Sequence, residues 1–168
     1  MARLATVALA ATSLTLVTIS SAGATAQASE TGSGRGSFGP YGYGGVKLGM
    51  TAEQAKATGK IVLKLRGTCS GWQYKAHPMG DGAVGIYISK KRGVAVIFAP
   101  AGVRTPRGIG VGATLNQVKN AYPGVKKQIS GYYVTVPGNR KAYYYFGVNQ
   151  RNKVEELGLG LKTQDCVS

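Results

Sequence analysis

The sequence predicts an α+β protein of two degenerate repeats, each a short capped helix followed by antiparallel strands. The main observation is a segment that occurs twice, GVKLGMTAEQAK at residues 45–56 and GIGVGATLNQVK at residues 108–119. Gly, Gly, Thr, Gln and Lys recur at the same places in both copies. Runs of β-forming residues follow each copy, so the flanking hairpins recur as well. We interpret this as an internal duplication with repeats at 43–105 and 106–168; chance similarity between two helix caps is the alternative.

Each copy of the segment predicts a helix of about two turns, over residues 52–58 and 115–121. In both copies a Thr is followed three residues later by a Gln, which is the spacing of a capping box. The two pairs are Thr51 with Gln54 and Thr114 with Gln117. Because helices this short are marginal in isolation, each has to pack against a sheet.

Alternating apolar residues, with turn-forming residues between the runs, predict six strands. They cover residues 61–65, 84–88, 94–98, 132–136, 141–146 and 154–161. In the last strand Gly158 and Gly160 alternate with leucines, so one of its faces is almost bare. A bare face of this kind favours close approach of another group.

Residues 1–28 have the features of a secretory signal peptide: an arginine near the start, an apolar stretch and small residues at its end. Cleavage fits after Ala26 or Ala28. A membrane anchor is the rival interpretation, but the stretch is rich in Ala, Thr and Ser, whereas a spanning helix needs about 20 strongly apolar residues. We expect a secreted, extracellular protein with no stable membrane insertion after cleavage. Residues 29–42 are Gly- and Ser-rich and predict a flexible leader, ordered towards Phe38 and Tyr41.

The chain is strongly basic, with 21 Lys and Arg against 6 Asp and Glu and a formal net charge of +15. Removal of residues 1–28 takes away one arginine, which leaves 20 against 6 and a net charge of +14. Such a charge draws a protein towards anions such as wall polymers, nucleic acid, anionic lipid or acidic proteins. The alternative is a basic surface that reflects extracellular life without a specific anionic partner.

The chain has two cysteines, Cys69 and Cys166, which predict a disulfide in an exported protein. Two unrelated thiols are the alternative. Two cysteines and one histidine are too few good ligands for a closed structural zinc site. We therefore expect neither a metal nor another cofactor.

The stretch VKLGMTAEQAKATG, residues 46–59, resembles the opening of secreted bacterial repeat domains that read I-x-x-G-M-T-x-x-Q-V. Two families use this pattern: the β-lactamase inhibitory proteins of actinobacteria and the SmpA/OmlA outer-membrane assembly lipoproteins. The resemblance implies tandem repeats of a helical segment and an antiparallel sheet, with a binding surface on the concave side of the sheet. This sequence departs from the inhibitory family, because it has one cysteine in each half and few acidic residues. β-Lactamase is therefore not carried over as the target.

Residues 66–82 have no counterpart in the second half and predict a long loop. The loop holds the only tryptophan, Trp72, and the only histidine, His77. Cys69, His77 and Asp81 would suit a thiol nucleophile with a base. A disulfide at Cys69 would remove that nucleophile, so we expect no catalytic residues and no enzymatic activity.

Two hairpin tips are basic, and tyrosines crowd the second hairpin. Alternation places Tyr143 and Tyr145 on one face of a strand and Tyr144 on the other, so one set belongs to the core. Exposed Tyr and Arg are frequent anchors in protein interfaces, and aromatics in a basic groove also stack bases or sugars. The candidate binding residues are Trp72, Tyr74, Lys90, Lys91, Arg92, Tyr133, Arg140, Lys141 and Tyr144. For the charged tips, protection of sheet edges from aggregation is the alternative.

The leading prediction is a secreted, non-catalytic protein that binds an extracellular protein, with inhibition as one form of that role. The first alternative is a basic adhesion protein that binds anionic polymers, either cell-wall polymer or nucleic acid. The second is an extracellular hydrolase with a site near His77.

Overall fold

The computed structural model describes residues 36–80 and 82–167. The predicted signal peptide, the first part of the predicted leader and Asp81 lie outside the described residues. Among the described residues, no helix is long and apolar enough to cross a membrane.

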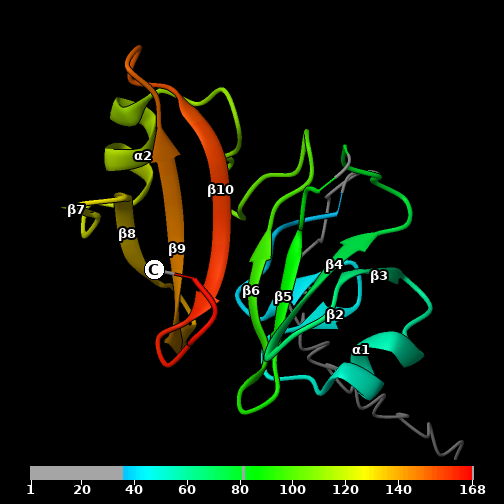
Figure 1. Ribbon diagram of the computed structural model, residues 1–168. Coiled ribbons are helices and arrows are strands. Elements are labelled where there is room, and N and C mark those ends of the chain that lie inside the picture. The colour runs from blue at the N-terminus through cyan, green and yellow to red at the C-terminus, as the bar shows by residue number, and fades with distance from the viewer. Residues whose placement is uncertain (1–35, 81, 168) are drawn as a thin grey trace, which may run out of the picture. The chain divides into compact units, whose positions relative to one another are not determined.

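An antiparallel sheet of eight strands runs through the described body in the order β3-β4-β5-β6-β10-β9-β8-β7 (Figure 1). Its strands are β3 (Ile61–Leu65), β4 (Cys69–Tyr74), β5 (Ile86–Ser89), β6 (Gly93–Phe98), β7 (Lys126–Gln128), β8 (Gly131–Val136), β9 (Asn139–Val148) and β10 (Val154–Leu161). Two short strands, β1 (Gly42–Tyr43) and β2 (Val46–Lys47), form a separate pair. The protein is therefore α+β, with most of its regular structure in one antiparallel sheet.

Strands β6 and β10 join the two groups of four strands. Three residue pairs make this joint, Gly158 with Phe98, Leu159 with Ile97 and Gly160 with Val96. In chain order, β3 to β6 therefore lie on one side of the joint and β7 to β10 on the other.

Two short helices precede these groups, α1 (Ala52–Ala57) and α2 (Leu115–Ala121). Both begin with the predicted capping box. The backbone N–H of Gln54 donates to the Thr51 hydroxyl at 3.2 Å, and the N–H of Thr51 donates to the Gln54 side chain at 2.9 Å. The corresponding distances at α2 are 3.2 and 2.8 Å. Each cap satisfies two backbone donors that the first turn leaves free.

The core lies on one face of the sheet. A row of cross-strand neighbours runs along that face, and all of its members are buried: Trp72, Ile86, Ile97, Leu159 and Tyr144. Tyr122, just after α2, packs its ring against Tyr144 and Phe146 at centroid distances of 5.8 and 5.6 Å. This is therefore the face that α2 covers.

The segment 66–82, predicted as a loop, contains a strand. Residues Cys69–Tyr74 form β4, which pairs with β3 and β5. Its sequence CSGWQY is a weak strand signal, because the alternation is limited to Trp72 and Tyr74, and Ser70, Gly71 and Gln73 are not strong β-formers. Strand β7 was also missed, since its three residues, Lys126–Gln128, are polar and exposed at the sheet edge.

The end of the predicted leader belongs to the packed body. Phe38 is fully buried, and its carbonyl accepts a 2.8 Å hydrogen bond from the Tyr144 hydroxyl. Its ring stacks on that of Tyr144 with a centroid distance of 6.1 Å. Burial of a large aromatic ring stabilises this end of the segment against the body. The leader is therefore ordered at Phe38, as expected from the sequence.

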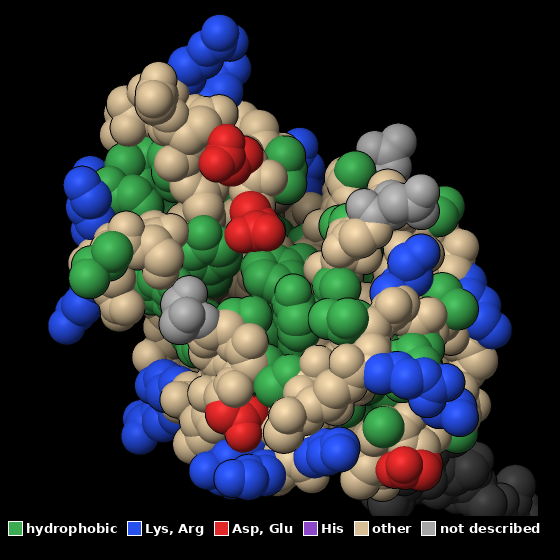
Figure 2. Space-filling model, in the orientation of Figure 1, with side chains coloured by type: hydrophobic (Ala, Val, Ile, Leu, Met, Phe, Trp, Pro, Cys, Tyr) green, Lys and Arg blue, Asp and Glu red, His purple; other side chains and the backbone are tan. Residues whose placement is uncertain are grey.

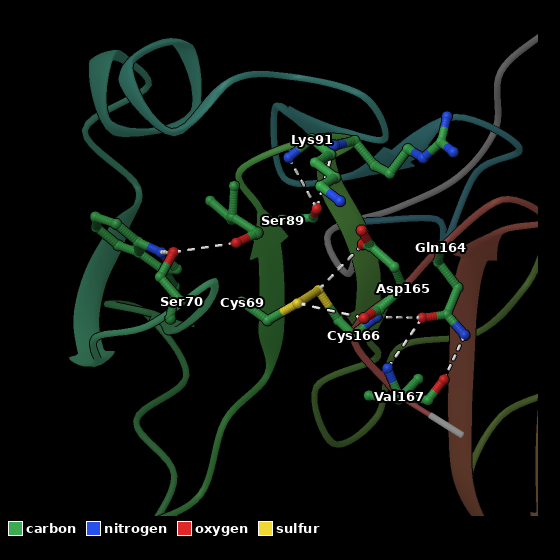
Figure 3. Close-up of a disulfide and its surroundings, with 11 residues drawn as sticks. Cys69, Ser70, Ser89, Lys91, Gln164, Asp165, Cys166 and Val167 are labelled. Atoms are coloured by element: carbon green, nitrogen blue, oxygen red, sulfur yellow. Dashed lines mark hydrogen bonds between the residues drawn. A yellow bond between two sulfur atoms is a disulfide. The ribbon is translucent and has the colours of Figure 1, made fainter.

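The predicted disulfide between Cys69 and Cys166 is present, with a Cα–Cα distance of 5.6 Å. Figure 3 shows how the Gln164 side chain organises the segment around it: its oxygen accepts from the N–H groups of Cys166 and Val167 at 2.9 and 3.0 Å. Because Cys166 follows β10 and Cys69 begins β4, the disulfide links strands that β5 and β6 separate. The disulfide is therefore a covalent link between the two groups of strands, in addition to the β6–β10 pairing.

Replacing both cysteines, Cys69→Ala with Cys166→Ala, should lower the free energy of unfolding by about 4–5 kcal/mol. The bridge closes a long loop, with a sequence separation of 97 residues, and so restricts the unfolded chain. Urea unfolding of both proteins measures the difference. A loss below about 1 kcal/mol would contradict the role of the bridge as a stabilising covalent link.

Candidate functional site

The face of the sheet opposite α2 carries a group of half-buried aromatic side chains. One cross-strand row there contains Tyr87, Val96, Gly160 and Tyr143, and a second contains Phe98, Gly158, Tyr145 and Tyr133. Cross-strand partners share a face, so these residues lie together, and the core row lies on the other side. We call the surface of Tyr87, Phe98, Tyr133, Tyr143 and Tyr145 the tyrosine face.

The glycines of β10 let the aromatic rings lie close to the backbone of the sheet. A Cβ atom at Gly160 would meet the ring of Tyr143 at 2.5 Å. One at Gly158 would lie 3.3 Å from Tyr145 and 3.4 Å from Phe98. The bare face predicted for this strand is therefore the floor on which the rings rest.

The three tyrosines of β8 and β9 form one packed group. The ring of Tyr133 lies 5.4 Å from that of Tyr143 and 5.1 Å from that of Tyr145. The Tyr145 hydroxyl donates to the Ser130 carbonyl at 3.0 Å, and the Ser130 and Tyr133 hydroxyls are 2.7 Å apart. Burial, and then the nearby Tyr133, raise the pKa of Tyr143 to about 12, so its hydroxyl is protonated at neutral pH. The rings are held in place before any partner arrives.

The tyrosine face is hollow. A cavity of about 720 Å³ is lined by aromatic rings of this face and by Lys162, Gln164 and Val167 of the segment after β10. Figure 2 shows hydrophobic side chains gathered in the hollow middle of this face, with acidic side chains at its edge and Lys and Arg farther out. At the tip between β7 and β8, Ile129 is fully exposed beside Ser130.

Two acids stand beside this face in an otherwise basic protein. Burial raises the pKa of the Glu156 carboxyl, the neighbouring Glu155 raises it further, and Tyr145 offsets part of the shift. Burial also raises the pKa of Tyr145, and the two glutamates add to that shift. Glu156 lines the hollow of the tyrosine face together with Lys126 and Lys162, so charges of both signs meet there.

The predicted site residues fall into three groups. Trp72, Tyr74 and Tyr144 lie in the core, with exposed fractions of 6, 5 and 1%. Tyr133 belongs to the tyrosine face, as do Tyr143 and Tyr145. The predicted alternation along β9 is therefore present, but Tyr144, which was predicted to bind, lies on the core face. Lys90, Lys91, Arg92, Arg140 and Lys141 are exposed at the two predicted tips, and the first three line a second hollow beside α1.

Two residues of the hydrolase interpretation, Cys69 and His77, are engaged in other contacts, and Asp81 lies outside the described residues. Cys69 is in the disulfide. The ring nitrogen Nε2 of His77 lies 3.2 Å from the Tyr43 hydroxyl. Among the described residues, one cluster places three potential metal ligands within reach of one another: Cys69, Asp165 and Cys166. The two cysteine sulfur atoms of this cluster are bonded to each other in the disulfide.

Sequence reasoning missed Tyr87, Phe98, Tyr143 and Tyr145 as residues of this surface. Strand alternation alone leaves the choice of face open, because both faces of β9 carry aromatic residues. The glycines of β10 were the available signal: they mark the face on which Tyr143 and Tyr145 lie.

No protein-family model matches the chain, and neither a curated protein nor a solved structure matches it. The similarity to secreted repeat families remains a prediction from the sequence.

Glu156→Gln should raise the melting temperature at pH 7, and the difference should shrink towards pH 4. A carboxyl whose pKa is higher in the folded chain destabilises the fold when ionised. That penalty is present above the folded pKa and is lost as the pH falls towards the unfolded value of about 4.3. Thermal unfolding from pH 4 to pH 8 measures it.

Glu53→Gln is the matched control with the opposite sign. A backbone hydrogen bond and the Thr51 hydroxyl lower the pKa of Glu53, so its stabilisation is present at pH 7 and is lost in acid. Glu53→Gln should therefore lower the melting temperature at pH 7. A change of the same sign for both substitutions at pH 7 would contradict the opposite pKa shifts of the two glutamates.

Proposed function

We propose that this is a secreted, non-catalytic protein that binds an exposed loop of another extracellular protein on its tyrosine face. The observation that carries the proposal is the packed group of half-buried tyrosines in a hollow of the sheet that α2 leaves uncovered. Inhibition would follow where the bound loop belongs to the active site of an enzyme.

The composition of the tyrosine face suits a protein partner. Tyrosine is enriched among the residues that contribute most to protein interfaces, because it combines a large apolar ring with a hydroxyl. The contacts of Tyr133 and Tyr145 with Ser130 hold these rings before binding. A fixed surface loses less conformational entropy on association than a mobile one.

The rim supports the same conclusion. Ile129 is fully exposed at the β7–β8 tip, and Leu65, at the far end of the Tyr87 row, is 53% exposed. Ile129 lies between Gln128 and Ser130, which both line the aromatic hollow, and so extends its apolar surface in a way that suits a protein partner. A soluble sugar would make little use of these aliphatic groups.

Secretion and duplication complete the proposal. Secretion is supported by the pattern of residues 1–28 and by the disulfide, a bond that persists in oxidising compartments. Duplication is supported by the two capping boxes. It is also supported by the strand order, because the last strand of each group of four lies at the joint and the first lies at the outer edge.

Capture from culture fluid tests the proposal. The immobilised protein should retain a discrete protein at about 1 M salt, where the screening length is about 3 Å. Tyr133→Ala and Ile129→Asp should each weaken this binding by at least about tenfold, which corresponds to about 1.4 kcal/mol. Because Ile129 is fully exposed, its substitution leaves folding unchanged.

Tyr41→Ala is the control. Tyr41 is 57% exposed, like a residue of a binding surface, but it lies outside the tyrosine face. Its variant should bind like the original protein. Equal retention by all three variants, or no retained protein at 1 M salt, would overturn the proposal.

A further inference from the structure

A second hollow, of about 1120 Å³, lies beside α1. It shares no lining residue with the hollow of the tyrosine face. Its lining includes the core residues Ile61, Trp72 and Ile88, each of which is at most 6% exposed. We call it the basic hollow, after the six Lys and Arg residues that line it: Lys56, Arg66, Lys75, Lys90, Lys91 and Arg92.

The charge of this hollow is almost all of one sign. Glu53 is the one acidic residue in its lining, against six cationic ones. The cations come from separate places in the chain: α1, the β3–β4 hairpin, the end of β4 and the β5–β6 turn. Charged residues on one edge strand are enough to protect that edge from aggregation. Protection of an edge therefore does not explain why cations from four segments meet around this hollow.

The β5–β6 turn, which supplies three of the cations, is held rigidly. The Ser89 hydroxyl accepts from the N–H groups of Lys91 and Arg92 at 3.0 and 3.2 Å, and Figure 3 shows Ser89 and Lys91 in this turn. Gly93 then packs against the chain before α1, where an added Cβ would lie 2.5 Å from the Met50 carbonyl oxygen. The N–H of Val94 donates to that carbonyl at 2.7 Å. The fold thus fixes the cationic turn against the segment that leads into α1.

The aromatic residue of the hollow is poorly placed to stack on bases. Trp72 is 6% exposed, and its indole N–H donates to the Ser70 hydroxyl at 2.8 Å. Binding of single-stranded nucleic acid relies on exposed aromatic rings as well as on cations. The hollow therefore provides positive charge without an exposed aromatic ring for stacking.

We propose that the basic hollow binds a flexible polyanion whose phosphate or carboxylate groups repeat along a non-aromatic backbone, such as a polyol-phosphate chain or an acidic glycan. Cations that reach the hollow from four segments match charges spread along a chain, and counterions released from that chain drive the association. This site is separate from the tyrosine face, so both can be occupied at once. The inference does not depend on the proposed function.

Binding to long-chain polyphosphate and to polygalacturonate, measured by titration calorimetry at several salt concentrations, tests the inference. The triple variant Lys90→Gln, Lys91→Gln and Arg92→Gln should bind at least tenfold more weakly at about 0.1 M salt. The magnitude of the slope of log K against log salt should fall by about 2–3, because each of the three lost contacts removes about 0.7–0.9 from it. Comparison of the two polymers distinguishes phosphate from carboxylate as the preferred group.

The matched control removes three positive charges elsewhere, through Arg140→Gln, Lys141→Gln and Arg151→Gln. These residues are exposed and line neither hollow. The control should retain at least half of the affinity for the preferred polymer. Equal losses in the two triple variants would show that net charge alone attracts polyanions and would overturn the site.

Two further probes address other classes of partner. Single-stranded DNA and vesicles that contain phosphatidylglycerol are titrated under the same conditions. Tighter binding to either probe than to both polymers, or no binding to the polymers at about 0.1 M salt, would overturn the inference. Thermal unfolding of both triple variants confirms that the comparison is between folded proteins.

Discussion

The pairing of β6 with β10 is the contact on which the rest of the structure depends. Three residue pairs convert two groups of four strands into one sheet. The core row and the tyrosine face both cross this joint, because Ile97 and Phe98 of β6 point to opposite faces and meet Leu159 and Gly158 of β10. A body of this length would be marginal as two separate sheets of four strands, since small domains bury too little apolar surface.

The glycines of β10 link the stability of the sheet to the proposed binding surface. Leu157 and Leu159 are buried on the face that α2 covers. On the other face Gly158 and Gly160 leave room for the rings of Tyr143 and Tyr145, which cover the backbone. Glycine in a strand weakens it, and contact with aromatic rings on neighbouring strands offsets this loss. The same contact holds the rings in the positions that the proposed binding surface requires.

Local signals in the sequence predicted most of the elements. The capping boxes located both helices, and β3 and β10 have the predicted bounds, because short-range patterns determine caps and alternating strands. Strand β4 was missed because pairing on both sides, and not its own composition, stabilises the sequence CSGWQY. The choice of the exposed tyrosine set depends on where α2 packs, which is a long-range contact that strand alternation does not encode.

The distribution of charge separates the two proposed surfaces. The basic hollow gathers six cations from four segments, whereas Glu155 and Glu156 stand beside the tyrosine face. Lys126 and Lys162 also line the hollow of the tyrosine face, so its charge is mixed, whereas the charge of the basic hollow is almost all positive. The same acids favour a partner loop that brings a lysine or an arginine towards the tyrosines, whose ring faces also attract cations. A protein held on an anionic polymer through the basic hollow would thus keep its tyrosine face free for another protein.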